Sequence, residues 1–318
     1  MENLKNKNII FIAPVFYDYH NQIIDHLNRK GANVTFFPER RTNLFYRFYY
    51  KFSNKLLNRY QKKYYETIAQ NINHDVVDYL FVIRGCQMPN EFIAFMKLKY
   101  PSIICIMYQW DSEKSNNFIH LKDCFDKLFT FDINDSIQYS LKYLPLFYTD
   151  DLKTICNVKK EVYKYDFFSL SLYTYERYLI VSNLSVLLKN YNVFFQLYIP
   201  YTRYLKEMLM GRKLSKKILI FNPLNRSQYL SKLEESKVVI DITHTIQSGL
   251  PIRIIESLAA GKTIISTNQL IVKEFNSLGN VFVLTDSTNF KNILYDSKSE
   301  SQINENYSLD KWLDVMFL

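Results

Sequence analysis

The sequence predicts an α/β protein of two domains, each built on a doubly wound parallel sheet. Short apolar runs rich in β-branched residues alternate with amphipathic, helix-like segments along the chain, which is the pattern of β-α-β units. This alternation is interrupted over residues 144–160, where we place a linker. The 318 residues suit about two domains. A composition of 48% hydrophobic and 22% charged residues argues against disordered and fibrous proteins.

The first half contains five strand-like runs with helix-like segments between them. The strand-like runs are Asn8–Val15, Asn33–Phe37, Asp78–Arg84, Ser102–Tyr108 and Lys127–Phe131. The helix-like segments are Tyr19–Lys30, Asn43–Ile72, Asn90–Lys99 and Ser136–Lys142. A strand, a helix and a second strand in this order form a parallel unit. We therefore expect a Rossmann-like domain over residues 1–150.

The second half repeats the alternation. Its strand-like runs are Asp166–Ser171, Asn192–Tyr198, Lys217–Phe221, Lys237–Ile242, Thr263–Thr267 and Asn280–Leu284. Its helix-like segments are Tyr175–Lys189, Tyr201–Met210, Arg226–Leu233, Pro251–Ala260 and Asn289–Leu294. We expect a second Rossmann-like domain over 151–305, a terminal amphipathic helix over 306–318, and a cleft between the two domains. Ligands of such sheets bind beyond the carboxyl ends of the strands, so residues that follow strands are the candidates.

The positive charge is concentrated in one segment. The formal net charge is +9, and there is no acid between Glu39 and Glu66. The eight bases of this segment are Arg40, Arg41, Arg47, Lys51, Lys55, Arg59, Lys62 and Lys63. Without them the net charge would be only +1. A partner of residues 40–63 should therefore be acidic.

The same segment carries apolar side chains at helical spacing. They are Phe45, Phe48, Tyr49, Phe52, Leu56 and Tyr60. A basic helix with an aromatic face suits an anionic inner-membrane surface or an acidic lipid-linked substrate. The alternative is a surface helix that packs its rings on the core and leaves its bases in water. No nucleic-acid-binding module accompanies the segment, so we do not expect a nucleic-acid partner.

Other classes of protein are disfavoured. No apolar run approaches the roughly 18–20 residues of a membrane-spanning helix. Lys5 and Lys7 precede an apolar run, but that run is short and ends at Asp18, so we interpret it as a first strand and not a signal peptide. The four cysteines form no C-x-x-C pair, which favours a reduced cytosol. We expect a cytoplasmic protein, with a peripheral position on the inner membrane as the alternative.

Residues 237–268 carry the most informative pattern, KVVIDITHTIQSGLPIRIIESLAAGKTIISTN. A strand is followed by a polar loop, and a helix begins near Pro251 with Ser248 or Gly249 as the expected N-cap. Such a helix start binds anions. Arg253 would add positive charge there, and Glu256 in the second turn could reach ligand hydroxyls.

The run Gly249–Gly261 resembles the nucleotide-sugar motif of GT-B glycosyltransferases of the group 1 and CgeB-like type. The resemblance implies that Glu256 holds the ribose hydroxyls of the donor. The larger group 1 families carry another Glu at the position of Ser248, beside Gln247, and its replacement here favours the CgeB-like branch. The predicted donor-binding residues are Glu256, Arg253, Gly249, Ser248, Gln247, Leu250, His244, Asn222, Ser171, Arg177 and Asn268.

Some of these positions have a second interpretation. Ser171 and Arg177 follow a strand where relatives approach the diphosphate, but they could equally belong to surface structure. Asn222 follows another strand and could contact the donor or cap a turn. No D-x-D stands at a strand end, so no metal is predicted. The resemblance instead implies a helix N-terminus and basic side chains that stabilise the diphosphate.

The first domain should bind the acceptor and supply a base. A carboxylate or histidine at a strand end could deprotonate an acceptor hydroxyl. The candidates are Asp111, favoured because it follows a strongly apolar strand beside Trp110, then His20 and Asp18. Arg84, also at a strand end, could neutralise a phosphate or serve as an ion-pair partner.

The sequence thus predicts a glycosyltransferase that moves a sugar from a nucleotide-sugar donor to a bacterial surface glycan such as lipopolysaccharide, O-antigen or capsule. The acceptor would be a glycan or a lipid-linked glycan, and no cofactor is expected. The alternatives are a catalytically degenerate sugar-nucleotide-binding module and a GT-B-like epimerase. A dinucleotide-dependent oxidoreductase is disfavoured, since no G-x-G-x-x-G follows a strand.

Overall fold

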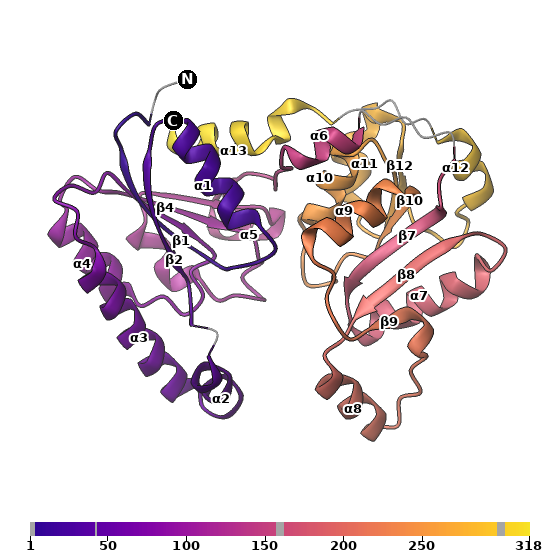
Figure 1. Ribbon diagram of the computed structural model, residues 1–318, viewed down its shortest axis with the longest axis horizontal. Coiled ribbons are helices and arrows are strands. Elements are labelled where there is room, and N and C mark those ends of the chain that lie inside the picture. The colour runs from indigo at the N-terminus through magenta and orange to yellow at the C-terminus, as the bar shows by residue number, and fades with distance from the viewer. Residues whose placement is uncertain (1–3, 42, 157–161, 298–302) are drawn as a thin grey trace. The chain divides into compact units, whose positions relative to one another are not determined.

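The computed structural model describes residues 4–41, 43–156, 162–297 and 303–318. The chain divides into two compact units (Figure 1). Unit 1 comprises the chain up to Leu146, the short segment Ile246–Gly249 and the terminal segment Leu309–Leu318. Unit 2 comprises Phe147–Thr245 and Leu250–Ser308.

Unit 1 is built on a six-stranded parallel sheet with the strand order β2-β1-β3-β4-β5-β6. The strands are β1 (Asn8–Ala13), β2 (Asn33–Pro38), β3 (Tyr79–Ile83), β4 (Ile104–Gln109), β5 (Lys127–Thr130) and β6 (Lys142–Tyr143). The five predicted strands are confirmed, and the two-residue β6 was not predicted. Because all strands run the same way, their carboxyl ends lie along one edge of the sheet.

The helices of unit 1 largely follow the sequence pattern. They are α1 (Tyr19–Arg29), α2 (Leu44–Phe52), α3 (Asn54–Asn71), α4 (Asn90–Lys99), α5 (Ile133–Tyr139) and α13 (Leu309–Phe317), with a 3-10 turn at Ile119–Cys124. The single helix predicted over 43–72 is wrong. Ser53 has an extended backbone (φ −161°, ψ 108°) and its side chain accepts a hydrogen bond from the Leu56 N–H, so a new helix begins there.

The terminal helix α13 completes the core of unit 1. The Trp312 ring lies 4.6 Å from the Tyr108 ring, edge to face. Lys30 of α1 pairs with Asp310 and Asp314 at 2.8 Å, and Figure 1 shows α13 beside α1. The predicted amphipathic helix is confirmed, because its apolar residues are buried: Leu309, Trp312, Leu313, Met316 and Phe317.

Unit 2 is built on a second six-stranded parallel sheet, ordered β12-β11-β10-β7-β8-β9. The strands are β7 (Tyr165–Leu172), β8 (Val193–Tyr198), β9 (Leu219–Ile220), β10 (Ser236–Asp241), β11 (Thr263–Ser266) and β12 (Val281–Val283). All six correspond to predicted strands. The carboxyl ends of β7, β10 and β11 are adjacent, and they position the candidate site described below.

Seven helices belong to unit 2 in the described part of the chain. They are α6 (Asp151–Cys156), α7 (Tyr175–Leu187), α8 (Tyr201–Leu209), α9 (Arg226–Glu234), α10 (Ile252–Ala259), α11 (Leu270–Phe275) and α12 (Phe290–Asp296). Helices α6 and α11 were not predicted, and α6 lies in the segment interpreted as a linker. Helix α10 is buried through Ile254, Ile255 and Leu258, which fixes its N-terminal end near the strand ends.

Candidate functional site

The buried carboxylate of Asp241 organises the carboxyl edge of the unit 2 sheet. Asp241 is the last residue of β10 and is 2% exposed. It accepts hydrogen bonds from Arg253 Nη2 at 2.9 Å and Thr243 Oγ1 at 2.6 Å, and from Ser266 Oγ at 3.2 Å. Arg253, from the first turn of α10, is thereby held at the strand ends. The sequence analysis missed Asp241, although its place at the end of an apolar strand was a usable signal.

Arg177 lies at the same edge, is buried, and donates hydrogen bonds to two backbone carbonyl oxygens. Its Nε donates to the Ile242 carbonyl at 2.8 Å and its Nη1 to the Leu172 carbonyl at 3.2 Å. Burial, reinforced by the nearby positive charge of Arg253, lowers the pKa of Arg177 to about 10. A desolvated cation beside a second cation favours a bound anion.

Two polar side chains complete this group. The Ser171 hydroxyl is buried, and no hydrogen-bond partner lies near it among the described residues. Burial lowers the pKa of His244, and the charge of Arg177 lowers it further. We call Ser171, Arg177, Asp241, His244 and Arg253 the Arg177–Arg253 cluster. With a neutral histidine its formal charge is +1, which suits an anionic ligand such as a diphosphate.

Glu256 forms a buried ion pair with Arg226. It is 1% exposed, and Arg226 Nη1 lies 2.6 Å from its Oε1. The same guanidinium reaches Asp151 of α6 at 3.0 Å and Thr149 Oγ1 at 3.0 Å. The sequence analysis missed Arg226 and Asp151. The capping box of α9, which spans Asn225–Gln228, indicates where that helix begins. It does not indicate what Arg226, the first residue of the helix, contacts.

The loop before α10 differs from the prediction. The N-cap of α10 is Pro251, and not Ser248 or Gly249. Ser248 belongs to unit 1, where Asp132 accepts hydrogen bonds from its N–H at 2.7 Å and from its Oγ at 2.6 Å. A side chain on Gly249 would bring its Cβ to 2.2 Å from the Phe131 carbonyl oxygen, so glycine is required there. Asp132, also missed, therefore anchors this loop.

The remaining predicted donor residues lie in several settings. Gln247 is half-buried and Leu250 is fully buried. Asn222 is exposed beyond β9. The Asn268 side chain accepts a hydrogen bond from the Leu270 N–H at 3.0 Å at the beginning of α11.

The three candidate bases lie at strand ends or helix starts of unit 1. Asp18 precedes α1 and accepts a hydrogen bond from Asn21 Nδ2 at 2.7 Å. The His20 ring lies 5.1 Å from the Phe36 ring, and its Nδ1 is buried with no hydrogen-bond partner among the described residues. Burial lowers the pKa of His20, although the charge of Asp18 opposes the shift. A neutral imidazole, the form that accepts a proton, is therefore favoured.

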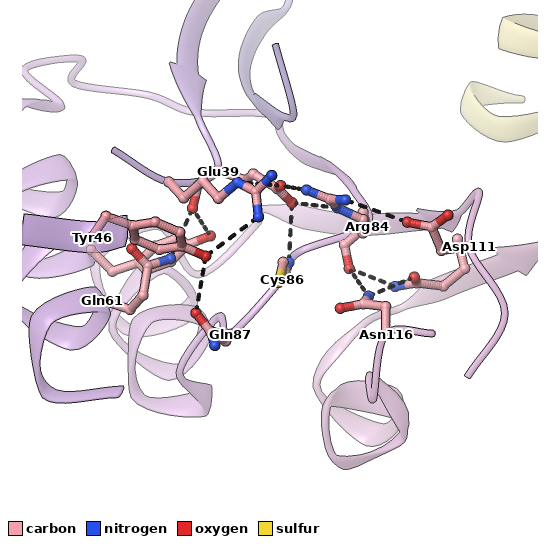
Figure 2. A network of polar contacts seen from close by, with 11 residues as sticks. Glu39, Tyr46, Gln61, Arg84, Cys86, Gln87, Asp111 and Asn116 are labelled. Carbon is pink, nitrogen blue, oxygen red and sulfur yellow. Dashed lines mark hydrogen bonds and ion pairs between the residues drawn. The ribbon is translucent and has the colours of Figure 1, made fainter. Parts of the chain in front are cut away.

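Asp111, the favoured base, belongs to a polar network at the carboxyl edge of the unit 1 sheet (Figure 2). Its side chain is 30% exposed, and its Oδ2 lies 3.4 Å from Arg84 Nη1. Arg84 also pairs with Glu39, which is completely buried. The sequence analysis named Arg84 and missed Glu39. Within the described residues, no group of three or more His, Cys, Asp or Glu side chains is arranged to hold a metal ion.

Solved structures share this architecture at low sequence identity. An α-glucosyltransferase, solved with UDP and a 13-mer DNA, is 13% identical with a TM-score of 0.54, over 98% of this chain and 100% of that one. UGT89C1 of Arabidopsis thaliana is 10% identical with a TM-score of 0.51, over 98% and 94%. The lipopolysaccharide outer core galactosyltransferase WaaB, in its apo form, is 10% identical with a TM-score of 0.50, over 96% and 98%. The fold is GT-B.

The sequence itself shows less similarity. No protein-family model matches it, and no curated protein matches it. The comparisons thus show the fold, and the activity has to be argued from the residues of the two sheet edges.

Proposed function

We propose that the chain is a glycosyltransferase that transfers a sugar from a nucleotide-sugar donor bound by unit 2. The observation that carries this proposal is the Arg177–Arg253 cluster. It places two guanidinium groups and one buried carboxylate at the carboxyl edge of a parallel sheet, where ligands of such sheets bind. A GT-B fold with this positive edge suits a donor that carries a diphosphate.

In this proposal Arg177 and Arg253 stabilise the diphosphate as it leaves. Negative charge grows on the leaving group in the transition state, and fixed cations in a desolvated site stabilise it without reorganisation. Arg177 is fixed by two carbonyl oxygens and Arg253 by Asp241. Glu256, held by Arg226, would accept hydrogen bonds from the ribose hydroxyls.

Unit 1 would bind the acceptor and supply the base. Asp111 is our first choice because its carboxylate is partly exposed and is oriented by Arg84. His20 is the alternative, because its buried Nδ1 has no hydrogen-bond partner in the described part of the chain. The proposed acceptor is a bacterial surface glycan, such as lipopolysaccharide or capsule, presented at a membrane.

Helix α2 supports a membrane-bound acceptor. The alternative, in which the rings of this segment pack on the core, does not hold for Phe45, Phe48 and Phe52, which are 65%, 56% and 63% exposed. Tyr46 is the buried residue of this helix. Exposed aromatic residues between bases suit the headgroup region of an anionic bilayer. In the described residues, no helix is both long and apolar enough to cross a membrane, and α2 would lie on the surface.

Calorimetry with UDP, GDP, CMP and dTDP tests the donor site. We expect one of these nucleotides to bind, and Arg253→Gln to raise its Kd about 10- to 100-fold, because a charged hydrogen bond contributes roughly 1.5–3 kcal/mol. Lys206→Gln removes the same charge from an exposed position on α8 and should leave Kd unchanged. If Arg253→Gln and the parent bind the nucleotide with the same Kd, the cluster is not part of the donor site.

A further inference from the structure

The loop after β3 is held in a strained conformation. Arg84 and Gln87 have φ values of +69° and +56°, and Gly85 between them has φ +61°. The left-handed region is unfavourable for residues other than glycine, so other contacts must hold the Arg84 backbone in this conformation. Its carbonyl oxygen accepts hydrogen bonds from Gln109 Nε2 at 2.8 Å and Asn116 Nδ2 at 3.0 Å, both from buried side chains.

The Arg84 side chain is held as firmly as its backbone. The Glu39 carboxylate is completely buried and accepts hydrogen bonds from Arg84 Nε at 3.0 Å and from Arg84 Nη2. It also accepts one from the Cys86 N–H at 3.2 Å, and Arg40 Nε lies 3.7 Å from it. Figure 2 shows Glu39 facing Arg84 and Cys86, with Asp111 on the other side of Arg84. One buried carboxylate thus orients two arginines.

The arginines keep part of their surface in solvent. The side chain of Arg84 is 17% exposed and that of Arg40 is 34% exposed. Two guanidinium groups share one buried carboxylate, which leaves a formal charge of +1. The following segment adds further bases and contains no acid until Glu66. Asp111, 3.4 Å from Arg84, is the opposing charge.

We propose that Arg40 and Arg84 form a phosphate-binding site in unit 1, which receives a phosphate or diphosphate group of the acceptor. This proposal rests on the proposed function and names the acceptor as phosphorylated. Guanidinium groups fixed by a buried carboxylate present their remaining N–H groups to phosphate oxygens without a further loss of side-chain entropy.

The site is also tied to the exposed aromatic helix. The Tyr46 hydroxyl accepts a hydrogen bond from Arg40 Nη1 at 3.4 Å and donates one to Gln87 Oε1 at 3.4 Å. The buried residue of α2 therefore contacts both the arginine before it and the strained loop. A lipid headgroup at the surface of α2 and a phosphate at Arg84 would be neighbours.

The Asp111 carboxylate lies close enough to Arg84 to affect the affinity for phosphate. A phosphate bound at Arg84 would lie close to the Asp111 carboxylate, and the two negative charges would repel each other. Asp111→Asn should therefore tighten phosphate binding about fivefold, by the loss of one repulsive charge at close range. A network that only stabilises the fold would show no such gain.

Selective labelling with ¹⁵N-glycine can report on the site directly. The chain has six glycines, and each follows a different residue type. A ¹³C-carbonyl label on arginine therefore identifies the Gly85 amide alone. Inorganic pyrophosphate added to the full chain at low salt should shift the Gly85 signal saturably, and it should not move the signals of Gly211 and Gly279.

Variants and a second probe complete the experiment. In Arg84→Gln a ¹³C-carbonyl label on glutamine identifies the Gly85 amide, and the variant should need about tenfold or more pyrophosphate for the same Gly85 shift. The control Lys142→Gln, at an exposed position of β6, should respond like the parent. Monomeric dihexanoyl phosphatidic acid then distinguishes the source. A response to the lipid alone assigns a headgroup site, and a response to both probes assigns a site for phosphate of any origin. A Gly85 signal that neither probe moves, or that moves equally in Arg84→Gln, overturns the proposal.

Calorimetry separates this proposal from the proposed function. Arg84→Gln should leave the nucleotide Kd unchanged, because the Arg177–Arg253 cluster belongs to unit 2. If the protein binds a nucleotide but neither phosphate probe shifts the Gly85 signal, the donor site is supported and the phosphate site in unit 1 is overturned. If the probes shift the Gly85 signal but no nucleotide binds, the phosphate site is supported and the donor site is overturned.

Discussion

Buried carboxylates fix the arginines of both sheet edges. Asp241 holds Arg253 in unit 2, and Glu39 holds Arg84 in unit 1. Removing one partner of a buried pair leaves the other charge without compensation. The same side chains thus support the fold and the candidate site, and variants must be chosen to separate the two effects.

Glu39→Gln should lower the free energy of unfolding by about 3–5 kcal/mol, because Arg84 would lose its buried counterion. Urea unfolding measures the change. The control is Glu91→Gln, since Glu91 forms an exposed pair with Lys62, and an exposed pair contributes only about 0–1 kcal/mol. Similar losses in both variants would show that the Glu39 pair is not specially stabilising.

Because Glu256 is buried, its replacement should affect stability as well as nucleotide binding. The sequence suggested a carboxylate that meets the donor, but the structure shows a buried group paired with Arg226. Glu256→Gln keeps the shape and should weaken nucleotide binding by about 1.5–3 kcal/mol for a lost charged hydrogen bond. It should also lower stability, so calorimetry needs to be run well below the unfolding temperature. Unchanged affinity in a folded variant would exclude Glu256 from the ribose site.

The two candidate bases predict different rate profiles. If Asp111 is the base, Asp111→Asn should lower turnover by about 10²–10⁴ while the nucleotide Kd is retained. If His20 is the base, His20→Ala should do so instead. The pKa of His20 is lowered in the folded protein, so its imidazole stays neutral to a lower pH than a free histidine, and the acid limb of the rate should then lie below about pH 6.5. If neither variant changes turnover, a mechanism without a protein base is favoured.

At the scale of elements, α2 and α3 show what periodicity can and cannot predict. The spacing of apolar residues predicted helix through residues 43–72, and both helices lie within that range. It could not locate the break, which depends on Ser53 leaving helical geometry and capping α3. Nor could it tell which rings are buried, because the break changes which faces meet the core.

Helix α2 and the first half of α3 should bind anionic vesicles. Replacing Arg47, Lys51, Lys55 and Arg59 by Gln should release the chain from vesicles of phosphatidylglycerol, at about 1 kcal/mol per base near the surface. Co-sedimentation at low salt measures this. Replacing Phe45 and Phe48 by Ser tests the aromatic part without changing charge. If the parent chain does not sediment with these vesicles, the membrane proposal fails.

For the whole molecule, alternation along the sequence was enough to predict two parallel sheets, since every predicted strand has a counterpart in the structure. Contacts between distant segments could not be predicted in this way. Glu39 and Arg84 are 45 positions apart, and the loop of Ser248 joins unit 1 through Asp132. Such pairs depend on three-dimensional packing and leave no periodic signal in the sequence.

The candidate site was predicted in part. Arg177, Arg253 and Ser171 were named from strand ends and a helix start, and the structure groups them at one sheet edge around Asp241. Asp241, Arg226 and the role of Glu39 were missed. Each of them forms an ion pair with a side chain of another segment, and a single sequence does not show such pairs.

Release of a nucleoside diphosphate from nucleotide sugars tests the central claim most directly. The chain is incubated with UDP-, GDP- and dTDP-sugars, with and without anionic membrane extract, and the released nucleotide is measured by ³¹P NMR. We expect release from at least one donor, faster with the extract, and about 10²-fold or more slower in Arg253→Gln, since that variant loses a group that stabilises the leaving diphosphate. Binding of a nucleotide without release from any nucleotide sugar would contradict the transferase and leave a sugar-nucleotide-binding module in its place.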